Sequence, residues 1–281
     1  MLYRARGAMG SVKGTTKSQG NKQEFDKFYT KPEIVDQCLN YLDLTKFDCI
    51  IEPSAGGGAF SNKIPRVFAF DLVPENENIQ QADWLKLDKT QFEQYKNILV
   101  IGNPPFGNNG KLAKKFLVES MKFADTVAFV LPKSFKKNSV KNRLPLDFVT
   151  ILEIDLPVNS FTLNDNDYSV PCVFQVWQKT ESMREKVVMK NKSALIDFTT
   201  IDKADFRIQR VGGRAGKASL NLDVSVNSNY FVKNNSGMSN EELIEMINSL
   251  VFPSINDTAG PRSLPKGELI SVLEKTVLEK M

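Results

Sequence analysis

The sequence predicts an α/β fold, and the spacing of its strand-end acids supports that prediction. Two short apolar segments, Ile50–Glu52 and Arg66–Asp71, each end in an acid, and a glycine-rich turn lies between them. The two acids are about 20 residues apart. Nucleotide-binding α/β units use a similar spacing to place a carboxylate on the ribose hydroxyls. A third acid, Asp83, follows further along the chain. We therefore expect a sheet whose strand ends line a ligand site.

The most informative segment is Asn103-Pro104-Pro105-Phe106, which follows the apolar run Asn97–Gly102. Proline has no backbone donor, so the strand must stop there and hold a rigid loop at its tip. Such a loop offers a side-chain amide, fixed carbonyl oxygens and a flat ring, which together suit a planar, amino-bearing group such as adenine. An ordinary turn is the alternative interpretation of these four residues.

The motifs occur in the order Phe28–Pro32, Glu52–Phe60, Asp71, Asp83-Trp84 and Asn103–Phe106. Over residues 25–180 this order resembles the adenine-N6 (amino) methyltransferases that use S-adenosylmethionine, and the N-terminal place of the first motif is similar to the gamma class. The resemblance implies a class I (Rossmann-like) methyltransferase sheet. It implies a catalytic role for Asn103, Pro104, Pro105 and Phe106, and cofactor contacts from Tyr29, Thr30, Glu52, Pro53, Ala55, Gly56, Gly58, Asp71, Leu72, Asp83 and Trp84. Lys31 departs from the pattern, since many members run from threonine directly to proline.

The absence of histidine excludes histidine-dependent nucleophilic catalysis and histidine-ligated metals. Methyl transfer remains possible, because the cofactor carries the activated methyl group. The Asn103 side-chain oxygen and the Pro104 carbonyl would accept hydrogen bonds from the substrate amino group. A base within a duplex must be flipped out to reach them, and Phe106 would be its stacking platform. A core aromatic that caps the strand is the alternative role for Phe106.

The charge distribution predicts a polyanionic partner. Residues 111–143 contain nine basic and two acidic side chains, a balance of +7, whereas the whole chain carries only +4. We expect the lysines of the helix Lys111–Ala124 to be a solvated face. We expect nucleic-acid backbone contacts from Lys133, Lys136 and Lys137, which follow the strand Thr126–Pro132, with simple solubility as the alternative. A basic turn further on is expected to make such contacts too, with an ordinary surface loop as an equal alternative: Arg207, Arg210, Arg214 and Lys217.

The remaining segments predict a closing strand pair and a second, smaller domain. Strands at 150–156 and 170–177 are joined by the polar loop 164–167, and form an antiparallel hairpin in the family. A polar linker, 179–192, precedes a mixed α+β domain with strands near 193–199, 205–211 and 228–232. Its helices are expected from Ser239, which forms a capping-box pattern with Glu242, and near 268–279. The predicted domains are residues 21–180 for methyl transfer and 181–281 for substrate recognition.

Composition fits an intracellular, soluble protein of the cytoplasm, nucleus or nucleoid. The chain has 281 residues, with 41% hydrophobic content and no apolar run of membrane-spanning length. Cys38, Cys49 and Cys172 are isolated, which predicts neither a disulfide framework nor a metal site. Residues 1–20 are interpreted as a tag or tail, with an expression-vector scar at Gly7–Ser11.

The function predicted from these features is methylation of adenine N6 in nucleic acid, DNA before RNA. The alternatives are methylation of glutamine side chains in proteins, methylation of adenine in RNA, and a catalytically idle binding subunit with the same fold.

Overall fold

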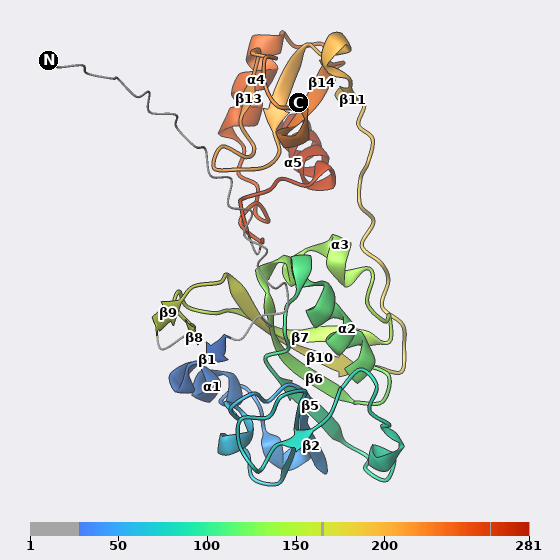
Figure 1. The fold of residues 1–281 in the computed structure, drawn as a ribbon. Coiled ribbons are helices and arrows are strands. Elements are labelled where there is room, and N and C mark those ends of the chain that lie inside the picture. The colour runs from blue at the N-terminus through green and yellow to red at the C-terminus, as the bar shows by residue number, and fades with distance from the viewer. Residues whose placement is uncertain (1–27, 164–165, 259, 281) are drawn as a thin grey trace, which may run out of the picture.

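The computed structural model describes residues 28–163, 166–258 and 260–280 (Figure 1). The tail or tag expected at residues 1–20 lies outside the described residues, as do Asn164 and Asp165 of the expected polar loop.

A seven-stranded mixed sheet forms the centre of the N-terminal part of the chain. In sheet order its strands are β4 (Gln80–Gln81), β3 (Val67–Asp71), β2 (Cys49–Glu52), β5 (Ile98–Gly102), β6 (Thr126–Pro132), β10 (Cys172–Lys179) and β7 (Phe148–Asp155). The strands from β4 to β6 are parallel, and β10 pairs antiparallel with both β6 and β7. The predicted α/β, Rossmann-like fold and its antiparallel closing pair are confirmed. The sheet interior is apolar, because every residue of β2, β5 and β6 is buried.

Helices cover the sheet where the sequence has apolar residues at helical spacing. The helix α1 (Pro32–Leu39) starts with proline in its first turn and buries Ile34, Val35 and Cys38. The helix α2 (Lys111–Ser120) is shorter than predicted, and by Asp125 the chain already donates a backbone N–H to the Ile98 carbonyl at the start of the neighbouring strand β5. The shorter helices are α3 (Asn138–Lys141), η1 (Leu44–Lys46), η2 (Ser61–Lys63), η3 (Thr90–Phe92), η4 (Asn108–Gly110) and η5 (Lys133–Lys136).

A second, three-stranded sheet corrects the prediction of a polar loop at 164–167. It consists of β1 (Tyr29–Thr30), β8 (Phe161–Leu163) and β9 (Asn166–Tyr168). Asn166 and Asp167 are therefore strand residues, and β8 pairs antiparallel with both other strands. The prediction failed because this hairpin is stabilised by pairing with β1, a segment more than 130 residues earlier in the chain, which local polarity cannot indicate.

The C-terminal part contains a four-stranded antiparallel sheet with two helices. In sheet order the strands are β11 (Ile196–Thr199), β14 (Asn229–Asn234), β12 (Phe206–Gln209) and β13 (Ala218–Ser219), with α4 (Asn240–Ser249), α5 (Lys266–Lys280), η6 (Ile201–Lys203) and η7 (Val226–Ser228). Ser239 and Glu242 form the predicted capping box at the start of α4. The buried apolar residues of this part form their own hydrophobic cluster, separate from that of the large sheet.

The linker between the two parts follows the surface of the first as an extended segment (Figure 1). The Arg184 guanidinium donates to the backbone carbonyls of Phe148 at 2.8 Å and Lys141 at 2.6 Å. The Asn142 side chain pairs with both backbone groups of Val187, at 2.8 and 3.0 Å. These contacts fix the linker to the turn that precedes β7.

The C-terminal part meets the first part just beyond the end of β6. Lys136 lies 3.9 Å from Asp257, and Lys137 donates to the Ser263 hydroxyl at 3.0 Å. Because β2, β3, β5 and β6 are parallel, their C-terminal ends share this edge of the sheet. The C-terminal part therefore lies at the edge where open α/β sheets bind ligands.

Candidate functional site

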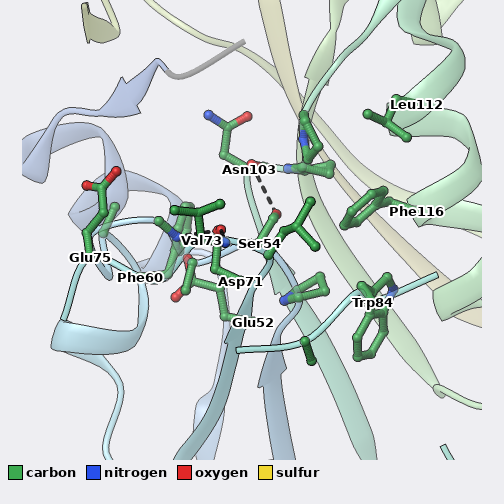
Figure 2. Close-up of a pocket in the computed structure, with 18 of the residues that line it drawn as sticks. Glu52, Ser54, Phe60, Asp71, Val73, Glu75, Trp84, Asn103, Leu112 and Phe116 are labelled. Atoms are coloured by element: carbon green, nitrogen blue, oxygen red, sulfur yellow. Dashed lines mark hydrogen bonds between the residues drawn. The ribbon is translucent and has the colours of Figure 1, made fainter. Parts of the chain in front are cut away.

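A pocket of about 210 Å³ lies at the C-terminal ends of β2, β3 and β5. Strand β1 supplies one wall, and Leu112 and Phe116 of α2 supply another. In Figure 2, Glu75 and Trp84 stand on opposite sides, with Glu52 and Asp71 between them and Asn103 above. The pocket thus joins the glycine-rich turn to the Asn-Pro-Pro-Phe loop.

Asp71 organises the turns that form the floor of the pocket. Its carboxylate accepts the backbone N–H of Gly56 at 2.7 Å and that of Val73 at 2.8 Å. Gly58 lies two residues after Gly56 in the same turn. Its φ is +88°, and a Cβ there would lie 2.8 Å from the Asn62 side chain. Glycine is therefore favoured at Gly58 by its positive φ, and a Cβ there would also require the Asn62 amide to move.

Glu52 is a buried acid at the end of β2. It is 1% exposed, and its Oε2 accepts the Ser61 N–H at 2.7 Å. Burial raises the pKa of Glu52 to about 7, against the hydrogen bond from the Ser61 backbone, which lowers it, and with a smaller upward contribution from the charge of Asp71. This carboxylate therefore changes its protonation state close to neutral pH.

Tyr29 and Glu75 connect strand β1 to the turn after β3. The Tyr29 hydroxyl donates to the Glu75 carboxylate, and the Tyr29 ring lies against Gly56. Burial and this carboxylate raise the pKa of Tyr29 to about 12, so it stays a donor at neutral pH. This bridge holds β1 over the glycine turn.

The pocket is acidic. Four carboxylates line it, from Glu52, Asp71, Glu75 and Asp83, and none of the described lining residues is lysine or arginine. Such a wall attracts a cationic ligand and disfavours a phosphate group, because like charges repel strongly in a partly buried site. The nucleotide cofactors that carry phosphates are poorly matched to it.

The residues that line the pocket include three buried polar atoms without a hydrogen-bond partner among the described residues. They are Thr30 Oγ1, Trp84 Nε1 and Asn103 Oδ1. An unpartnered buried polar atom costs about 1–3 kcal/mol, so such groups usually have a ligand or water to satisfy them. The Asn103 backbone is fixed by the Ser54 hydroxyl, which donates to the Asn103 carbonyl at 3.3 Å (Figure 2). One acceptor, one donor and one hydroxyl that can act as either are thus left without a partner among residues that line the pocket.

The structure brings most of the predicted site residues together. Of the expected cofactor residues, all except Gly58 line the pocket: Tyr29, Thr30, Glu52, Pro53, Ala55, Gly56, Asp71, Leu72, Asp83 and Trp84. Asn103, Pro104 and Pro105 line it too. Phe106 does not. It is 5% exposed and packs against Phe28, which agrees with the alternative interpretation of Phe106 as a core aromatic that caps the strand.

The expected nucleic-acid residues lie outside the pocket lining and mostly contact the protein itself. Lys133 and Lys136 each pair with Asp155 at 2.8 Å. In the C-terminal part, Arg207, Arg210 and Lys217 donate to the backbone carbonyls of Asn221, Asn227 and Asn248, whereas Arg214 is exposed. Charge counting found these residues but could not show which charges are already neutralised within the fold.

Several lining residues were missed from the sequence. They are Phe28, Ser54, Ala59, Phe60, Val73, Glu75, Ala82, Leu85, Leu112 and Phe116. Phe28, Ser54, Ala59 and Phe60 lie within the motifs and could have been included on that ground. No local signal distinguishes Glu75 from the neighbouring Glu77. The described residues contain no group of acids and cysteines arranged for a metal ion, and no helix among them is long and apolar enough to cross a membrane.

The comparisons with known proteins identify the family. The family model of the EDM2 methyltransferase-like domain matches residues 30–186, more than half of the chain and the part that contains the pocket. The chain belongs to the EDM2 methyltransferase-like domain family. A curated relative is Protein ENHANCED DOWNY MILDEW 2 of Arabidopsis thaliana, 28% identical over 123 residues. That alignment covers 38% of this chain and only 9% of the relative, so this chain corresponds to a small fraction of the plant protein.

Two solved structures are among those with detectable similarity to this chain. One is a modification subunit of a candidate type I restriction enzyme from Vibrio vulnificus, with TM-score 0.42 and 16% identity, covering 55% of this chain and 45% of that chain. The other is described as a candidate RNA methyltransferase from Pyrococcus horikoshii, with TM-score 0.44 and 13% identity, covering 58% of this chain and 91% of that chain.

Proposed function

We propose that this member of the EDM2 methyltransferase-like domain family binds S-adenosylmethionine in the acidic pocket and methylates the N6 amino group of adenine in nucleic acid, DNA before RNA. The observation that carries the proposal is the position of an unpartnered Asn103 oxygen on the wall of a pocket that contains four carboxylates and no described basic residue. A cationic cofactor matches the carboxylates, and a substrate amino group matches the oxygen.

The residues present fit the cofactor. Asp83 and Trp84 would hold its adenine and Asp71 its ribose, while Glu52 and Thr30 lie where the family resemblance puts the methionine end. The unpartnered Thr30 and Trp84 atoms supply an acceptor and a donor. When bound, S-adenosylmethionine supplies a methyl group on a sulfonium, which is already an activated leaving group.

Asn103 and the neighbouring prolines act on the substrate. The Asn103 side-chain oxygen and the Pro104 carbonyl accept hydrogen bonds from the amino group, which orients its lone pair and favours a tetrahedral nitrogen. The two prolines keep these acceptors in place, since their φ angles are restricted. No strong base is needed, because the amino nitrogen becomes acidic only after it is methylated.

Asn103→Ala tests the proposal. We expect the variant to lose most methyl transfer and to keep cofactor affinity, because the missing bonds are made to the substrate. Asn108→Ala, at an exposed asparagine of the same loop region, is the matched control. The assay follows tritiated methyl transfer to duplex DNA, RNA and protein fractions in parallel, with calorimetry for the cofactor. Activity of Asn103→Ala near that of the unchanged protein would contradict the catalytic role.

The same assay separates the alternatives. Label in protein alone would support glutamine methylation, and label in RNA alone would support an RNA adenine methyltransferase. Cofactor binding without label in any fraction would indicate an idle binding subunit.

The C-terminal part is proposed to be an accessory domain, residues 181–281, that helps hold the nucleic acid, with residues 21–180 as the catalytic domain. Its separate hydrophobic cluster and its place at the strand-end edge support this division. Backbone phosphates are proposed to contact Lys133, Lys136 and Lys137 and the basic turn of Arg207, Arg210, Arg214 and Lys217.

A further inference from the structure

Four aromatic rings lie together beside the Asn-Pro-Pro-Phe loop, and Phe28 contacts the other three. Its ring stacks on that of Tyr168, with centroids 5.0 Å apart and planes inclined by 18°. It meets the Phe106 ring at 5.5 Å and 52°, and the Phe161 ring edge-on at 6.0 Å. Among the four, only Phe28 lines the pocket, together with Asn103. Phe28 therefore fills the slot between the catalytic loop and the β8–β9 hairpin.

The walls of this slot are more firmly held than the ring that fills it. Phe161 is 0% exposed and Phe106 is 5% exposed, and Phe161 pairs directly with Tyr168 across β8 and β9. Phe28 precedes β1, a strand of only two residues. Displacement of the Phe28 ring would therefore disturb little secondary structure, whereas the other rings are fixed by the core and by strand pairing.

We propose that Phe28 is a specificity-determining gate, which yields its place between Phe106 and Tyr168 to a planar aromatic amine. The proposal rests on the proposed function and deepens it, because it names aromatic amines, rather than carboxamides, as the substrate class. It also gives buried Phe106 a role, since its ring becomes a stacking surface once Phe28 leaves.

The discrimination follows from what the incoming group must replace. Moving Phe28 breaks three ring contacts and exposes apolar surface, so the substrate must offer a flat face of similar size. A purine has such a face, and its exocyclic amino group can reach the neighbouring Asn103 acceptor. A glutamine side chain carries the amide but no ring, so it cannot compensate for the displacement of Phe28.

Removal of the Phe28 ring tests the gate. The probe is 2-aminopurine riboside, whose fluorescence decreases when its base stacks on an aromatic ring. We expect Phe28→Ala to bind it about tenfold more tightly than the unchanged protein, because the competing ring is gone and one stacking contact is worth a factor of this order. Tyr168→Ala added to Phe28→Ala should lose that gain. Equal or weaker binding by Phe28→Ala would overturn the proposal.

Matched controls define the effect as local. Phe68→Ala removes a ring that is 40% exposed on β3 and contacts Phe92 and Tyr95, so it should leave riboside affinity unchanged. A blocked glutamine amide should gain no affinity in Phe28→Ala, and a gain of the same size as for the riboside would contradict the selection of aromatic amines.

Circular dichroism would reveal whether Phe28→Ala folds. If it does not, a second variant, Phe28→Trp, tests the gate. In Phe28→Trp the indole emission should shift to longer wavelength when adenosine is added, because the displaced ring enters water. Unchanged emission while the protein still methylates adenine would overturn the gate and leave the proposed function standing. If the emission of Phe28→Trp shifts as expected but the unchanged protein transfers no methyl group to adenine, the proposed function is contradicted instead.

Discussion

The Glu52 carboxylate accepts the Ser61 backbone N–H at 2.7 Å although it lies almost completely out of water. One hydrogen bond to the charged form does not offset burial, and the pKa of Glu52 is raised to about 7. The folded protein therefore binds a proton more tightly at this position than the unfolded chain does. Stability must fall as pH rises from the ordinary glutamate range to about 7, and then level off.

We expect Glu52→Gln to remove this loss. Above pH 8 the variant should be more stable than the unchanged protein by up to about 3 kcal/mol, and near pH 4 the two should be equal. Urea unfolding at both pH values measures the difference, with Glu185→Gln, at an exposed glutamate of the linker, as the control. A stability difference that is the same at both pH values would show that folding does not shift the pKa of Glu52.

The same variant should weaken the binding of a cationic cofactor. Ionised Glu52 attracts positive charge, so affinity of the unchanged protein for S-adenosylmethionine should decrease as pH falls below about 7. Glu52→Gln should show low affinity and little dependence on pH. Calorimetric titrations between pH 6 and pH 8.5 test this, and a parallel pH dependence in both proteins would assign the titration to another group.

Asp71→Ala should reduce cofactor affinity by about tenfold or more, the scale of losing a charge-assisted hydrogen bond. The loss has two sources, since the Asp71 carboxylate also holds the N–H groups of Gly56 and Val73. Asp202→Ala, at an exposed acid of the C-terminal part, controls for the change in net charge. Calorimetry decides the matter, and unchanged affinity would remove Asp71 from the site.

The lysines that follow β6, Lys136 and Lys137 in particular, should control the salt dependence of nucleic-acid binding. Each phosphate contact releases counterions, so the double variant Lys136→Gln, Lys137→Gln should weaken binding to all sequences and lower the log–log salt slope by about two. The matched control is Lys114→Gln, Lys115→Gln on α2, where we predict a solvated face. Titrations at several salt concentrations are required, and equal slopes for both double variants would place the phosphates elsewhere.

Arg184 should be important for stability rather than for catalysis. Arg184→Met keeps an unbranched side chain but removes the donors to Phe148 and Lys141, and should destabilise the protein by about 1–3 kcal/mol. Lys186→Ala, at an exposed position in the same linker, should have no such effect. Denaturant unfolding measures both variants, and a negligible change for Arg184→Met would mean that the linker is not held by this residue.

The sequence alone determined those parts of the molecule that depend on local pattern. The apolar run Thr126–Pro132 predicted β6 to the residue, and the acids Glu52 and Asp71 were correctly expected at strand ends, where both line one pocket. Both inferences succeed because strand formation follows from nearby residues, and parallel strands necessarily bring their carboxyl ends to one edge.

The tertiary structure alone decided which distant groups meet. Tyr29 and Glu75 are 46 residues apart, and Phe28 stacks on Tyr168 only because β1 pairs with the β8–β9 hairpin. Likewise, counting charges found the lysines that follow β6, but only the structure shows that Asp155, at the end of another strand, pairs with both Lys133 and Lys136. Such pairings depend on the free energy of the whole packed chain, and no local periodicity or charge count contains them.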